Sequence, residues 1–143
     1  SWNEISKPYY LDKHNVIRVE KEGLRLPNGL YIRYPGLTWD TSESKSKFVY
    51  KSRRGFNSIW GGSVVENIVQ ALARIIIGEQ MLIVNRKYRP VLTVHDAIVN
   101  VVPANEIDDA MKYITDIMST PPDWAKDLPV ACEAHFGDSY GDC

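Results

Sequence analysis

The chain has 143 residues, a net charge of -1 and 44% hydrophobic residues. This composition excludes wholesale disorder, and the balanced charge excludes a strongly basic protein that coats nucleic acid, although it leaves room for a local basic patch. No window approaches about 18 uninterrupted apolar residues, so we expect no membrane partner. The cysteines show neither CxxC nor zinc-finger spacing, which favours reduced thiols in the cytoplasm over a disulfide framework. We expect a single domain over residues 1–143.

Turn and strand signals alternate in the first part of the chain. Residues 26–29 (Leu-Pro-Asn-Gly) predict a turn, because Asn-Gly accommodates positive φ. Residues 30–34 follow and predict a strand that ends at Pro35. For residues 36–58 we predict an exposed basic hairpin or loop, with a return strand at 48–50.

This predicted hairpin concentrates positive charge. Its basic residues alternate with the aromatic residues Phe48 and Tyr50, and they are Lys45, Lys47, Lys51, Arg53 and Arg54. An ordinary solvated hairpin explains the pattern. Contact with the phosphates of a nucleic acid is the alternative.

Two helices are predicted. Apolar residues at helical spacing predict a long helix over 63–84, largely buried, with Ser63 and Glu66 forming a capping box. A second amphipathic pattern predicts a helix over 104–118. Residues 128–132 then predict a short edge strand, and the tail from Phe136 predicts an ordered loop.

The most informative segment is 90–103. Two runs of β-branched residues are broken only by His95 and Asp96, which predicts a tight hairpin. Two-residue turns favour Asn-Gly or Gly-X, so His-Asp is a local misfit of the kind that often marks a functional site. The hairpin would present the Asp96 carboxylate as an oxygen ligand for Mg²⁺. An ordinary solvated aspartate in a turn explains the pattern equally well.

Residues 92–99 (Leu-Thr-Val-His-Asp-Ala-Ile-Val) resemble motif C of the family A, or DNA polymerase I-like, DNA polymerases. Residues 66–74 are similar to the palm helix of that family, which carries an Asn/Gln pair. The resemblance is strongest over residues 60–103 and covers most of the chain. Further segments resemble the phage-encoded branch, and they are residues 26–29, 60–62, 121–124 and 139–142.

The resemblance implies roles for several residues. Asp96 corresponds to an aspartate that binds the two catalytic Mg²⁺ ions, and His95 to a histidine at the primer end. Gln70 and Asn67 resemble residues that contact the DNA minor groove, where an amide donor checks base-pair geometry without reading sequence. A satisfied polar pair on a helix would explain these two amides as well. We assign DNA binding also to Arg74 and to the basic residues Lys51, Arg53 and Arg54.

The chain departs from the family pattern. Ala97 follows His-Asp where the family often has Glu, and Asn67 lies three residues before Gln70 where many relatives have four. The family's other catalytic aspartate, in an Asp-Tyr-Ser type motif, and the nucleotide-binding fingers helix have no counterpart. One carboxylate cannot hold two Mg²⁺ ions against their hydration. We therefore expect a C-terminal palm portion of a larger polymerase that acts on primer-template DNA and dNTP and is inactive alone.

The expected fold class is α+β. We predict an antiparallel sheet with the His-Asp hairpin at its centre and both helices packed on one face. Because part of the palm and all of the fingers would be missing, we expect exposed apolar surface that favours self-association.

Two alternative functions stay open. One is a non-enzymatic module that binds DNA or a protein. The other is a metal phosphohydrolase with a His-Asp pair, which would need further His and Asp ligands beyond His14 and His135.

Overall fold

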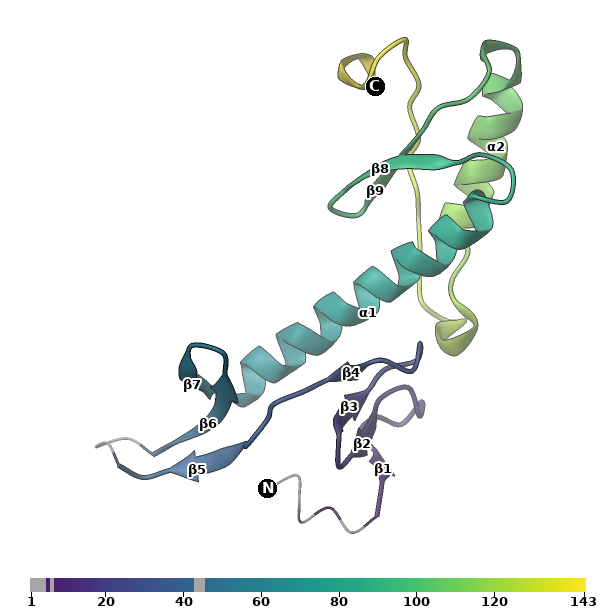
Figure 1. Cartoon of the computed structure of the whole chain (residues 1–143). Coiled ribbons are helices and arrows are strands. Elements are labelled where there is room, and N and C mark those ends of the chain that lie inside the picture. Colours follow the sequence, from purple (N-terminus) through teal and green to yellow (C-terminus); the bar gives the residue numbers. More distant parts are fainter. Residues whose placement is uncertain (1–4, 6, 43–45) are drawn as a thin grey trace. The chain divides into compact units, whose positions relative to one another are not determined.

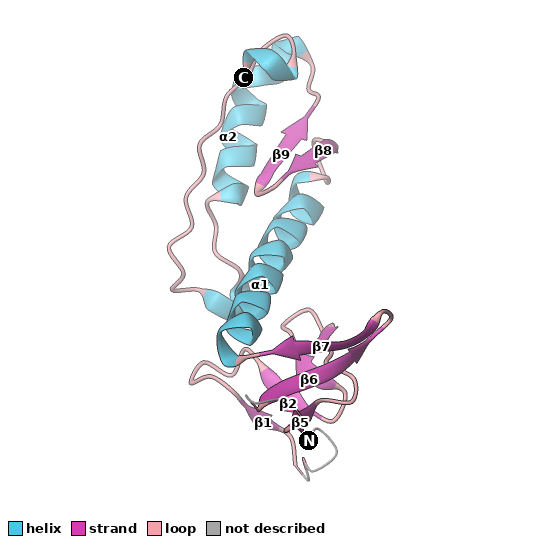
Figure 2. Cartoon of the chain, turned by 90° about the vertical axis from the view of Figure 1, so that its left-hand side faces the viewer, coloured by secondary structure: helices cyan, strands magenta, loops and turns pink. Residues whose placement is uncertain are grey.

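The computed structural model describes residues 5, 7–42 and 46–143 (Figure 1). It confirms the α+β class, with antiparallel sheets and two main helices (Figure 2). The chain divides into two compact units, residues 1–72 and 73–143, and the single domain expected from the sequence stays a prediction. Each unit is described by itself.

The first unit begins with a four-stranded antiparallel sheet. Its strands follow one another in chain order and are β1 (Tyr9–Tyr10), β2 (Arg18–Glu20), β3 (Gly23–Arg25) and β4 (Tyr31–Ile32). The predicted turn is confirmed, because the Gly29 N–H donates to the Leu26 carbonyl (2.9 Å) and Gly29 has a φ of 82°. The predicted strand over 30–34 is shorter than expected, because only Tyr31 and Ile32 pair with β3. Tyr34 follows this strand and is buried.

A three-stranded sheet follows, made of β5 (Thr38–Asp40), β6 (Lys47–Ser52) and β7 (Gly55–Ile59). The predicted return strand is confirmed and extends over all of β6, whereas β5 and β7 were not expected as separate strands. Val49 and Ile59 bury their side chains and hold this sheet against the unit's core. Lys45 lies outside the described residues.

Helix α1 (Gly61–Val84) confirms the long predicted helix but starts earlier. The Val64 N–H donates to the Trp60 carbonyl (3.2 Å), so Ser63 lies inside the first turn. The predicted capping box at Ser63 is therefore wrong. The prediction that the helix is largely buried is also wrong, since Val69 is 59% exposed and Leu82 is 72% exposed.

By length and composition α1 is long and apolar enough to cross a membrane, and 22% of its most apolar stretch is buried. Core helices of soluble proteins meet the same criteria. Polar side chains interrupt this helix at Asn67, Gln70, Arg74 and Glu79, and such groups are costly in lipid. The absence of a membrane partner therefore stays a prediction.

The second unit contains the hairpin of β8 (Pro90–Val94) and β9 (Ala97–Asn100), followed by α2 (Ile107–Met118). In the described part of the chain this hairpin is a two-stranded sheet of its own, so the predicted central position in a larger sheet is wrong. The predicted helix over 104–118 is a 3-10 turn, Ala104–Glu106, that runs into α2.

The segment after α2 has little regular structure. The predicted edge strand at 128–132 is wrong, because no described strand pairs with it and Pro129 lacks a backbone N–H. Short 3-10 turns occur instead at Asp123–Ala125 and Tyr140–Asp142. The tail is an ordered loop, as predicted, with a capping box that joins Ser139 to Asp142.

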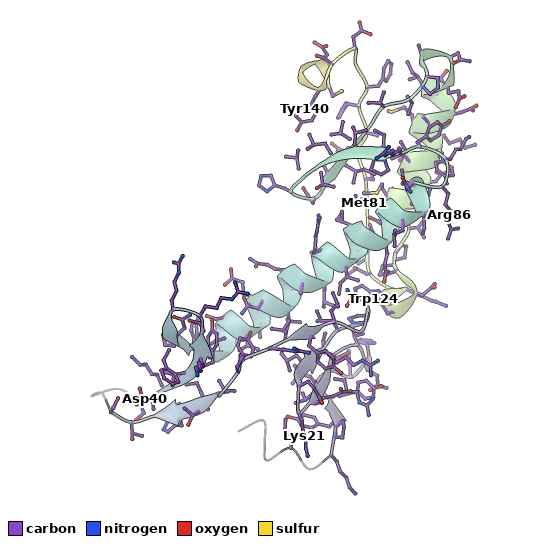
Figure 3. The ribbon with its side chains drawn as sticks, viewed as in Figure 1. Lys21, Asp40, Met81, Arg86, Trp124 and Tyr140 are labelled. Carbon is purple, nitrogen blue, oxygen red and sulfur yellow. The ribbon has the colours of Figure 1, made fainter. Side chains whose placement is uncertain are left out.

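Polar clamps join α1 to the segments around it in the second unit. The buried Gln80 amide donates to the carbonyls of Met118 (3.0 Å) and Thr120 (3.2 Å). The Trp124 indole N–H lies beside α1 and donates to the Glu79 carboxylate at 3.2 Å (Figure 3). These bonds fix the end of α2 against the second half of α1.

Large apolar side chains are nevertheless exposed in this unit. They are Leu82, Ile83, Val91, Leu92, Val101, Leu128, Phe136 and Tyr140.

Candidate functional site

The His-Asp turn is tight and locally strained. Val94 pairs with Ala97, so His95 and Asp96 are the only residues between the strands. His95 has a φ of 54°, in a region that costs an ordinary side chain roughly 1–2 kcal/mol. The φ of Asp96 is not positive. A positive φ at the first central residue alone matches a type II′ turn, in which that residue is normally Gly. Both side chains are exposed, which leaves the carboxylate at the tip available to a ligand.

The base of this hairpin is held by two partly buried hydrogen bonds. The Asn100 side chain donates to the Tyr88 carbonyl (3.0 Å), and the Tyr88 hydroxyl donates to the Glu106 carboxylate (2.9 Å). Burial and the bond to Glu106 raise the pKa of Tyr88 above its ordinary value. The Tyr88 phenol donates to Glu106 and so links the base of the hairpin to the segment before α2.

Asp96 does not form a metal site with its neighbours. Within residues 5, 7–42 and 46–143, no group of three or more His, Cys, Asp or Glu side chains could hold a metal ion. Mg²⁺ keeps several waters and binds through one or two carboxylates together with substrate phosphates. The turn thus offers the single carboxylate of Asp96, and the described residues hold no complete site for two ions. Such a cluster is also what a His-Asp phosphohydrolase would need, so we do not propose that alternative.

The predicted DNA-binding amides lie on the first part of α1. The Asn67 amide donates to the Tyr34 hydroxyl (2.8 Å), whereas the Gln70 amide makes only a long contact of 3.4 Å to Glu66. Residue 74 is four positions further along, so helix geometry places Arg74 on the same face as Gln70. The Asn67 amide is thus hydrogen-bonded within the protein, while the side chains of Gln70 and Arg74 are exposed and can contact a ligand.

The structure brings together the three basic residues of the hairpin that are predicted to bind DNA. Lys51 lies near the end of β6, and Arg53 and Arg54 form the turn before β7. The Ser52 hydroxyl donates to the Gly55 carbonyl (2.8 Å) and accepts from the Arg54 N–H (3.3 Å). All three cations are exposed, and no ion pair joins them to an acid within the described residues.

Phe56 is a residue that the sequence analysis did not single out. It pairs directly with Lys51 across the hairpin and is 69% exposed. The signal was present in the sequence, because an aromatic residue follows the Arg-Arg-Gly turn. It was missed because β7 was not predicted as a strand.

The predicted site residues belong to different units. His95 and Asp96 lie in the second unit, whereas Asn67, Gln70 and the basic hairpin lie in the first. Arg74 falls just beyond the division, on the continuous helix α1.

The chain is similar to a DNA polymerase of Bacillus phage SP02. The two are 33% identical over 147 residues, which cover 94% of this chain and 22% of the phage polymerase. The chain thus spans about a fifth of the length of the relative it matches. No protein-family model matches the chain. No solved structure matches it. This similarity supports a relationship to DNA polymerases, as the sequence motifs predict.

Proposed function

We propose that this chain is the C-terminal palm portion of a family A DNA polymerase, acting in template-directed DNA synthesis. The observation that carries the proposal is the two-residue turn between β8 and β9. In this turn His95 has a positive φ and the side chain of Asp96 is exposed. A turn selected for stability alone would have Gly or Asn at the first position. The similarity to a phage DNA polymerase supports the same function.

In the proposed enzyme, Asp96 supplies one carboxylate to a site for two Mg²⁺ ions. Such ions activate the attacking hydroxyl and stabilise the leaving group in nucleotidyl transfer. The remaining ligands and the groups that bind the incoming dNTP come from polymerase regions outside this chain. The 143 residues alone are therefore expected to be inactive.

The first unit, together with Arg74 further along helix α1, supplies contacts to primer-template DNA. The exposed Gln70 amide is suited to the minor-groove edge of the base pairs, and Arg74 to a nearby phosphate. Asn67 takes a positioning role, because its bond to Tyr34 ties α1 to the core of the first unit. Lys51, Arg53 and Arg54 bind phosphates.

Primer extension by the complete polymerase tests the proposal. Removing one metal-binding carboxylate forfeits several kcal/mol of transition-state stabilisation, so Asp96→Asn is expected to lower the extension rate about 10³-fold or more. Primer-template affinity should change little. Asp108→Asn, at an exposed carboxylate of α2, is the matched control and should leave the rate unchanged. Equal rates for the two variants would refute the role of Asp96.

A non-enzymatic DNA-binding module is the second candidate, and the exposed basic hairpin favours it because that surface lies within one unit. An immunoblot of the source separates the two. A band several times larger than 16.3 kDa supports the polymerase, and a band near 16.3 kDa supports the free-standing module.

A further inference from the structure

The hairpin of β6 and β7 differs in charge from the rest of the chain. Residues 47–59 hold four basic residues and no acidic residue, whereas the whole chain has a net charge of -1. The nearest acid on this sheet is Asp40, which pairs with Lys47 at the end away from the turn. Hydrogen bonds from Ser42, and then the charge of Lys47, lower the pKa of Asp40. The turn end of the hairpin is therefore positive, with no acid on the same strands to neutralise it.

Phe56 stands among these charges without an aromatic partner. Trp39 and Phe48, on the same sheet, pack edge to face with ring centroids 4.6 Å apart. Phe56 makes no such ring contact with any described residue and leaves 69% of its surface exposed. Exposing a large ring to water has no benefit for folding. A planar ligand that covers the ring would remove its apolar surface from water, and this burial would favour binding.

The hairpin fixes this ring beside the cations. Directly paired residues in an antiparallel sheet have Cβ atoms about 5 Å apart on one face, so Phe56 and Lys51 lie side by side. Gly55, with a φ of 119°, takes the positive backbone angle at the end of the turn, which leaves Arg53 and Arg54 in ordinary conformations. Proteins that hold single-stranded nucleic acid likewise combine aromatic rings, on which bases stack, with cations that contact the phosphates.

We propose that this hairpin binds single-stranded DNA, with Phe56 stacking on a base and Lys51, Arg53 and Arg54 binding the adjacent phosphates. A duplex does not fit as well, because its bases are already stacked on one another and offer no free face. The inference rests on the proposed function, which makes the unpaired template strand the source of the DNA.

Fluorescence anisotropy of the 143-residue chain with labelled 12-nucleotide probes tests the stacking. The probes are oligo-dT, an abasic strand with the same phosphates, and a 12-base-pair duplex. Base–aromatic stacking of about 1–3 kcal/mol corresponds to a loss of roughly fivefold or more in oligo-dT affinity for Phe56→Ala. The same variant should leave abasic affinity unchanged, and Phe56→Trp should restore oligo-dT binding.

Phe136→Ala is the matched control, since Phe136 is 61% exposed in the other unit. It should leave all affinities unchanged. Equal loss of oligo-dT and abasic binding in Phe56→Ala, or duplex binding as tight as oligo-dT binding, would overturn the inference.

The salt dependence tests the phosphate contacts. Each contact on a single strand contributes about 0.7 to the slope of log affinity against log salt. Replacing Arg53 and Arg54 by Ala should reduce that slope by about 1.4, whereas replacing the exposed Lys13 and Lys21 should not change it. An unchanged slope in the double arginine variant would overturn the phosphate assignment.

The two proposals fail separately. If Phe56→Ala does not weaken oligo-dT binding selectively, primer extension by the complete polymerase can still depend on Asp96. Loss of the Asp96 dependence leaves the single-strand binding of this chain intact.

Discussion

Gln80 is expected to contribute strongly to the stability of the second unit. Its side chain is 5% exposed, and its amide is the donor to two carbonyls near the end of α2. Replacement by Met keeps the length, the unbranched shape and the helix propensity but removes both bonds. The Met118 carbonyl, on a buried residue, is left without this donor, which costs about 1–3 kcal/mol. The Thr120 carbonyl is on an exposed residue and regains water, so its loss is smaller.

Together these losses predict that Gln80→Met lowers the free energy of unfolding by about 2 kcal/mol, or the Tm by roughly 4–8 °C. Urea unfolding followed by circular dichroism measures the change. Gln70→Met is the matched control on the same helix, because Gln70 is exposed and its one contact is 3.4 Å long. We expect it to change stability by less than about 0.5 kcal/mol. Equal effects of the two variants would refute the argument that the buried amide clamp stabilises the unit.

Three further predictions follow from other features. Gly23→Ala should prevent stable folding of the first unit, because Gly23 has a φ of 138° and a Cβ there would collide with the Ile32 carbonyl oxygen; thermal unfolding checks this. The bond from Tyr31 to Glu20, and then burial, raise the pKa of the Tyr31 phenol, so the folded state retains that proton longer than the unfolded chain. Stability should therefore fall as pH rises above about 10, and Tyr31→Phe should weaken this dependence in urea titrations at pH 8 and 11. The exposed apolar side chains of the second unit predict self-association, and light scattering that shows a monomer at high concentration would contradict it.

Sequence patterns predicted the parts of the fold where local and tertiary preferences agree. The long helix, the helix ending at Met118 and the turn at Gly29 all have strong local signals, and the structure contains each of them. The start of α1 was missed because Ser63 and Glu66 match a capping box by spacing alone, while the glycines before them already adopt helical geometry. The edge strand predicted at 128–132 is absent because a short apolar segment with no neighbouring strand has no partner for its backbone groups.

The candidate site likewise has features that local sequence patterns predict and features that depend on distant contacts. The position of Asp96 in a two-residue turn could be read from the β-branched runs on either side, and the pairing of Val94 with Ala97 agrees. The bond between Asn67 and Tyr34 could not be foreseen, because it joins residues 33 positions apart in the sequence. Phe56 was missed for a similar reason, since its exposure depends on how β7 pairs with β6.

The order of the strands has a consequence for how the chain reaches its structure. In the described part of the chain, every strand pairs only with strands adjacent to it in sequence. Short loops close at little cost in chain entropy, and folds dominated by such local pairing form quickly. No early strand has to wait for a distant partner. Each sheet can therefore pair its strands without waiting for residues that come later in the chain.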